Sequence, residues 1–154
     1  MDIRPAESLE DIAAVRELWI EYWQSFGLPL HFQGFSAELD TLPGVYSPPS
    51  GILLLALVDS APAGTIALRP LGPSTGELKR LFLRQKYRGF GLGKALLEAV
   101  FDHSRTAGYH FLCADTLPVM SEALNLYFRY GFERTEPYSA SPTPGAIYLK
   151  RKLD

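Results

Sequence analysis

The first apolar pattern in the chain has the spacing of an amphipathic helix. Ser8, followed three residues later by Asp11, resembles a capping box, and apolar positions recur with helical spacing from there to about Ser25. A weaker helical pattern follows at residues 36–42. The side chains expected on the buried face of the first helix are Leu9, Ile12, Val15, Trp19 and Tyr22.

The rest of the chain alternates between strand-like and helix-like segments. Two apolar runs joined by a short polar segment predict a hairpin, and the later strands are separated by helices, as in βαβ units. Early strands and late βαβ units together predict an α+β fold with a mixed sheet. The predicted strands are residues 2–5, 52–58, 64–71, 77–83, 109–115, 132–137 and 146–152, and the later helices are residues 92–106 and 121–129.

Composition is that of an ordinary globular protein. The 154 residues are 47% hydrophobic and 21% charged, which predicts one domain over residues 1–154. A net charge of −2 gives no general attraction for nucleic acid, and the longest apolar run, residues 52–58, is too short to cross a bilayer. Cys113 is the single cysteine, so an internal disulfide is excluded. We therefore expect a cytoplasmic protein without a nucleic-acid or membrane partner.

A glycine-rich segment between a predicted strand and a predicted helix carries the clearest chemical signal. Residues 88–94 read Arg-Gly-Phe-Gly-Leu-Gly-Lys, and the alternate glycines leave the backbone N–H groups of a helix start open to an anion such as a phosphate. Arg88, Lys94 and Ala95 stand where a Walker A or dinucleotide-binding loop requires other residues, so neither motif applies. The loop alone leaves open that its glycines serve only close packing.

Two motifs together resemble the GNAT superfamily of acyl-CoA-dependent N-acetyltransferases. The coenzyme motif of that family, Gln/Arg-x-x-Gly-x-Gly/Ala between a strand and a helix, is matched by residues 86–91. A second signature, Ala-x-x-Leu-Tyr-x-x-x-Gly-Phe, is matched by residues 123–132. The resemblance covers about residues 51–153, with Lys86 in place of Gln or Arg and Met120 where many members carry Asn.

The resemblance implies a fold and a co-substrate. The fold is a mixed, mostly antiparallel sheet of six to seven strands, splayed at a coenzyme cleft and flanked by about four helices. The co-substrate is acetyl-CoA, whose pantetheine arm would pair with a strand edge and whose pyrophosphate would lie on the loop N–H groups. Whether the Arg88 side chain itself binds phosphate stays open. The implied coenzyme-binding residues are Leu81, Phe82, Leu83, Arg88, Gly89, Phe90, Gly91, Leu92, Gly93 and Lys94.

Acetyl transfer to an amine needs a proton acceptor and a proton donor. Presenting a lysine-like amine in its neutral form at neutral pH costs about 4.6 kcal/mol. By the resemblance, Glu77 and Asp115 at neighbouring strand ends are the candidate bases, with Glu77 preferred; the alternatives are a solvated acid and a helix cap. By its place in the second signature, Tyr127 is the expected acid; the alternative is a core residue with its hydroxyl satisfied. A phenol stays protonated at neutral pH and can protonate a departing thiolate.

The expected acceptor is the primary amine of a small molecule. In the family the first helices and the final hairpin form the acceptor side, and no large acid cluster in those parts favours a basic protein tail. The three histidines lack zinc-binding spacing, so no metal is predicted. The rival function is a binding module that senses acyl-CoA without turnover, and homodimerisation, common in the family, stays open. The candidate acceptor-side residues are Trp23, Phe26, His31, Phe32, Phe35, Tyr46, Tyr138 and Tyr148.

Overall fold

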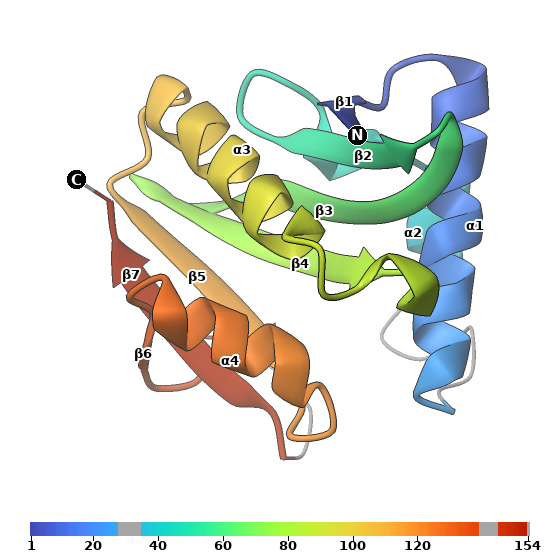
Figure 1. The fold of residues 1–154 in the computed structure, drawn as a ribbon. Coiled ribbons are helices and arrows are strands. Elements are labelled where there is room, and N and C mark those ends of the chain that lie inside the picture. Colours follow the sequence, from blue (N-terminus) through green and yellow to red (C-terminus); the bar gives the residue numbers. More distant parts are fainter. Residues whose placement is uncertain (28–34, 139–144, 154) are drawn as a thin grey trace.

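A seven-stranded sheet with helices on both faces organises the molecule (Figure 1). The computed structural model describes residues 1–27, 35–138 and 145–153. The strand order is β1-β2-β3-β4-β5-β7-β6, and neighbouring strands are antiparallel except for β4 and β5, which are parallel. The predicted α+β fold with a mixed, mostly antiparallel sheet is therefore confirmed.

Helices and strands follow the predicted order. Two short 3-10 helices, η2 (Gly44–Tyr46) and η3 (Gln85–Tyr87), lie in connections. The α-helices of the described residues are α1 (Leu9–Ser25), α2 (Phe35–Asp40), α3 (Leu92–Thr106) and α4 (Ser121–Arg129). The strands are β1 (Asp2–Pro5), β2 (Ile52–Val58), β3 (Ala61–Gly72), β4 (Thr75–Leu83), β5 (Phe111–Thr116), β6 (Glu133–Arg134) and β7 (Ile147–Lys152).

Several strand boundaries differ from the prediction, most of them by one or two residues, and β3 and β6 differ the most. β3 begins at Ala61 rather than at residue 64, because Asp59 and Ser60 both adopt positive φ and make a two-residue turn that pairs Ala61 with Val58. β6 covers two residues instead of 132–137. Thr135 N–H still donates to Tyr148 O at 2.8 Å, but residues 135–138 form no strand.

The first helix forms largely as its pattern predicts. The Ser8 hydroxyl accepts a hydrogen bond of 3.0 Å from the Asp11 N–H, which caps the helix. The predicted inward residues from Ile12 to Tyr22 are buried, but Leu9 is 92% exposed, so the prediction for Leu9 is wrong. Leu9 lies in the first turn, roughly a third of a turn away from the centre of the buried stripe.

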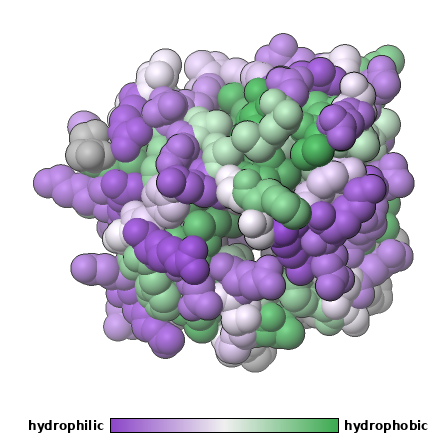
Figure 2. Space-filling model, viewed as in Figure 1, coloured by the Kyte–Doolittle hydropathy of each residue, from purple (hydrophilic) through white to green (hydrophobic). Residues whose placement is uncertain are grey.

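Each face of the sheet has its own hydrophobic core. One core joins α3 and α4 to the sheet and includes Leu78, Leu96 and Tyr127. The other lies under α1 and α2 and includes Trp19 and Phe82. The outward side of α3 carries hydrophilic residues (Figure 2). No helix in the described ranges combines the length and apolar character needed to cross a membrane.

A bulge in β4 changes which side chains face α1 and α2. Arg80 adopts a φ of 60°, and the β3–β4 register shifts between Thr65 and Ala67. The extra residue interrupts the two-residue alternation of the strand. As a result Lys79 and Arg80 both reach polar partners on the α1 and α2 face, and Phe82 follows them into that core.

The sheet opens between β4 and β5. These parallel strands pair from Thr75 with Phe111 as far as Leu78 with Ala114. β4 then continues to Leu83 against β3 alone. The predicted splay is therefore present, and it leaves the β5-facing edge of the last β4 residues without a strand partner in the described chain.

Candidate active site

The glycine loop presents a run of unpaired backbone N–H groups at the start of α3. Gly89 and Gly91 have φ of +86° and +82°, a conformation that strains other residues. Within the described chain the backbone N–H groups of residues 89–94 make no backbone hydrogen bond, and the first paired amide is Ala95 N–H, bonded to Gly91 O at 3.0 Å. Phe90 points outward and is 81% exposed. The loop therefore has the unpaired donors that an anion needs.

The remaining predicted loop residues are fixed by their neighbours. Leu92 is buried in the α3 core, while Lys94 is exposed on the first turn of α3. A Cβ at Gly93 would lie 3.3 Å from Leu126, so this glycine lets α3 approach α4. Arg88 donates from Nε to Leu83 O at 3.0 Å and lies 3.8 Å from Glu122. Its side chain thus holds the end of β4, and 38% of it is exposed.

The predicted coenzyme edge lies beside this loop. Leu81 and Leu83 are half-buried against the α3 core, and Phe82 is buried on the opposite face, where it makes an edge contact with Tyr22. Beyond the splay, the Thr116 hydroxyl at the end of β5 is buried and has no hydrogen-bond partner in the described chain. An extended chain with amide groups fits such a site, because it could pair with the β4 edge and satisfy this hydroxyl.

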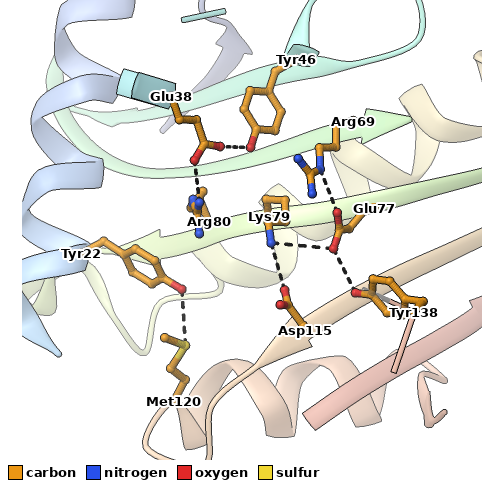
Figure 3. A network of polar contacts seen from close by, with 10 residues as sticks. All are labelled: Tyr22, Glu38, Tyr46, Arg69, Glu77, Lys79, Arg80, Asp115, Met120 and Tyr138. Carbon is orange, nitrogen blue, oxygen red and sulfur yellow. Dashed lines mark hydrogen bonds and ion pairs between the residues drawn. The ribbon is translucent and has the colours of Figure 1, made fainter. Parts of the chain in front are cut away.

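A chain of ion pairs crosses the sheet at the splay (Figure 3). Glu77 is almost fully buried, with 3% of its side chain exposed. Its Oε1 accepts from Arg69 Nε at 2.8 Å, and its Oε2 accepts from the Tyr138 hydroxyl at 3.0 Å. Lys79 Nζ lies 3.7 Å from Glu77 Oε2 and donates to Asp115 Oδ1 at 3.2 Å. The two candidate bases therefore share one lysine.

The two acids differ in how many partners they have. Both oxygens of Glu77 are engaged, and its neighbours include two cations. Asp115 contacts one cation through Oδ1, and 24% of its side chain is exposed. Its Oδ2 has no hydrogen-bond partner in the described part of the chain. Asp115 is thus the acid with a free oxygen at the splay.

A second polar group was not predicted from the sequence. Arg80 packs against the rings of Trp19, Trp23 and Phe35, with 9% of its side chain exposed, and its Nη2 lies 2.6 Å from Glu38 Oε2. Glu38 also accepts a hydrogen bond from the Tyr46 hydroxyl. The only signal for it in the sequence is a basic residue inside an apolar strand. The pairing partner comes from α2, which is distant in the sequence.

Tyr127 faces the interior from α4. Its side chain is buried against Phe132, with 5.1 Å between ring centres. Burial raises the pKa of the Tyr127 phenol, and the charges of Tyr22, Asp115 and Glu77 add to the shift. Its hydroxyl makes no hydrogen bond to any described residue. An unpaired phenol that stays protonated suits a proton donor.

Met120 joins α4 to α1 across the splay. Its Sδ accepts a hydrogen bond from the Tyr22 hydroxyl at 3.3 Å (Figure 3). Burial is the main cause that raises the pKa of Tyr22 to about 12. The thioether therefore replaces the polar contact expected of Asn at this position with a bond to a phenol.

Most of the predicted acceptor-side aromatics are core residues. Trp23 stacks on Phe35 with 4.2 Å between ring centres, and Tyr46 is buried against Trp19. Tyr138 packs edge-on against Tyr148, and its hydroxyl reaches the ion pairs. Phe26 packs against Tyr22. His31 and Phe32 lie outside the described residues.

Comparison with known proteins identifies several relatives. The sequence model described as the acetyltransferase (GNAT) family matches residues 12–132. An uncharacterized N-acetyltransferase of Schizosaccharomyces pombe is 36% identical over 146 residues, covering 94% of this chain and 90% of that protein. A GNAT-family acetyltransferase structure from Staphylococcus aureus superposes with a TM-score of 0.85 at 20% identity over 99% of both chains. The PaiA N-acetyltransferase of Thermoplasma acidophilum, in complex with coenzyme A, gives 0.75 at 21% identity over 99% of both chains. The two structural likenesses establish the fold.

Proposed function

Because this chain belongs to the acetyltransferase (GNAT) family and is an acetyl-CoA-dependent N-acetyltransferase of that family, we propose that it acetylates the primary amine of a small molecule by direct attack. Bound acetyl-CoA supplies the acetyl thioester. The observation that carries the proposal is the opening of the sheet after Leu78 and Ala114, beside the unpaired donors of the glycine loop. Residues 81–83 would hold the pantetheine arm, and their N–H groups would polarise the thioester carbonyl.

We assign the proton acceptor to Asp115 rather than Glu77, which reverses the order favoured by the sequence. Glu77 is held by Arg69, Lys79 and Tyr138, so taking up a proton would disrupt three contacts. Asp115 Oδ2 is free within the described chain and partly exposed, so an amine or a bridging water can reach it. In this account Glu77 fixes Lys79 and Arg69 in place.

Tyr127 is the proposed proton donor to the departing thiolate. Burial raises its pKa, so the phenol carries its proton at every pH where the reaction would run. The same dry surroundings raise the pKa of a departing thiol, which favours its protonation. The hydroxyl has no competing hydrogen bond within the described chain, and this leaves it available to the sulfur.

Thiol release from acetyl-CoA with a panel of small amines tests the proposal. We expect amine-dependent release that Asp115→Asn lowers by about 10²- to 10⁴-fold, as for loss of a general base. Asp102→Asn is the matched control, because Asp102 is an exposed acid on α3 that pairs only with Arg105 among the described residues. Saturable coenzyme binding without release for any amine would contradict the proposal and favour the acyl-CoA sensor.

A further inference from the structure

Arg69 holds an unused pair of donors beside Glu77, at one end of the ion pairs that lead through Lys79 to the proposed base Asp115. It lies on β3 directly opposite Glu77, and its Nε donates to Glu77 Oε1 at 2.8 Å. Neither of its Nη atoms has a hydrogen-bond partner in the described chain, and 38% of the side chain is exposed. One edge of the guanidinium is therefore anchored, while the Nη donors remain open to an anion.

The other two cations of the ion pairs at the splay, Lys79 and Arg80, already bind acidic side chains. Lys79 is shared between Glu77 and Asp115, with 11% of its side chain exposed. Arg80 is enclosed by aromatic rings and paired with Glu38. Among these three cations of the described chain, Arg69 alone combines free Nη donors with access from solvent.

The anchoring of Arg69 is firm. Glu77 is itself held by the Tyr138 hydroxyl and Lys79, so it fixes the plane of the guanidinium. The other acid whose charge acts on Arg69 is Glu38, and Glu38 is already bound to Arg80 and Tyr46. A planar fork held in advance is suited to bidentate binding of a carboxylate.

The charges of these buried and half-buried ion pairs also favour a ligand with no net charge. Three cations, Arg69, Lys79 and Arg80, balance three acids, Glu38, Glu77 and Asp115. An entering ammonium alone would leave an excess positive charge in a partly buried site. A zwitterion would keep the balance, with its amine toward Asp115 and its carboxylate toward Arg69.

We propose that Arg69 binds a carboxylate of the acceptor, so that the preferred substrate is an amino acid or another small amine that carries a carboxylate. The proposal rests on the proposed function, because it concerns the acceptor of the same reaction. It makes Arg69 a residue that determines specificity and gives it no part in proton transfer.

Matched acceptors with and without a carboxylate test this role. We would compare kcat/KM for L-phenylalanine with phenethylamine, and for β-alanine with ethylamine, in the wild type, Arg69→Gln and Arg69→Lys. Loss of charge-assisted bonds predicts a fall of about 10- to 150-fold for the amino acids in Arg69→Gln and little change for the plain amines. Arg69→Lys restores part of the loss. Arg105→Gln, at the far end of α3, is the control and changes neither class.

A binding measurement tests the carboxylate site at Arg69 independently of acetyl transfer. Calorimetry on the protein loaded with coenzyme A should show N-acetyl-L-phenylalanine binding more tightly than N-acetylphenethylamine, with the difference lost in Arg69→Gln. Equal binding of the two, or an equal effect of Arg69→Gln on both acceptor classes, overturns the role of Arg69. Selective binding with no thiol release for any amine overturns the proposed function and leaves the carboxylate site standing. Thermal unfolding checks that each variant folds.

Discussion

Replacing Tyr127 with Phe tests the proposed proton donor through two quantities that should move independently. The side chain is buried, and its hydroxyl has no hydrogen-bond partner among the described residues. Removing the hydroxyl while keeping the ring against Phe132 should change the free energy of unfolding by less than about 1 kcal/mol.

Turnover should fall sharply. Loss of a positioned proton donor lowers kcat by about 10²- to 10⁴-fold, which corresponds to about 2.7 to 5.5 kcal/mol in the activation free energy. The affinity for acetyl-CoA should change little, since the phenol acts on the departing sulfur. Because burial raises the pKa of Tyr127 above its ordinary value near 10, the wild type should show no loss of activity from its deprotonation below about pH 10.

Two assays test whether Tyr127 is a proton donor or only a core residue. Urea denaturation gives the free energy of unfolding, and thiol release with a reactive amine gives kcat for each variant. Tyr130→Phe is the matched control, since Tyr130 lies next to the end of α4 and its exposed hydroxyl donates to Glu98. The control should keep its turnover. A Tyr127→Phe protein that is less stable by more than about 1 kcal/mol, with unchanged turnover, would make Tyr127 a core residue and refute the reasoning.

The remaining predictions concern the base, the loop and the buried ion pair. The loss of kcat/KM in Asp115→Asn should become smaller as the pH approaches the pKa of the acceptor amine, near 10, because neutral amine is then available without a base. A loss that stays constant with pH would rule out Asp115 as the proton acceptor. Gly91→Ala should weaken acetyl-CoA binding in calorimetry by about tenfold, because the substituted loop relaxes when free and returning it to a positive φ on binding costs roughly 1 to 2 kcal/mol. Gly108→Ala, with φ of +88° but outside the loop, should not weaken binding. Glu38→Gln should lower the free energy of unfolding in urea by about 3 kcal/mol, because it leaves a buried guanidinium uncompensated. Glu98→Gln, on the exposed side of α3, should lower the free energy of unfolding by less than about 1 kcal/mol. Equal losses of stability in Glu38→Gln and Glu98→Gln would contradict the role of Glu38 in neutralising Arg80.

The order of elements could be predicted from the sequence because periodicity reports local structure. The apolar run of residues 52–58 and the glycine loop ahead of residue 92 each determine an element without reference to the rest of the chain. Leu9 shows the limit of this reasoning. Its spacing from Ile12 is helical, but whether a residue in a first turn is covered depends on where the helix crosses the sheet.

Candidate site residues can be proposed from the sequence where a motif marks them, but contacts between distant segments cannot. The loop and Tyr127 are proposed site residues because each belongs to a local signature in the sequence. The pairing of Arg80 with Glu38 depends on the β4 bulge and on the docking of α2, and neither leaves a pattern in the sequence. The same is true of the Tyr138 hydroxyl, which reaches Glu77 from a segment 61 positions later.

The central claim is that the glycine loop and the free edge of β4 hold acetyl-CoA. Calorimetric titration of the protein with acetyl-CoA tests it most directly. We expect saturable binding of one coenzyme per chain, and weaker binding in Gly91→Ala. Absence of association at about 1 mM acetyl-CoA, equivalent to less than about 4 kcal/mol of binding free energy, would contradict it.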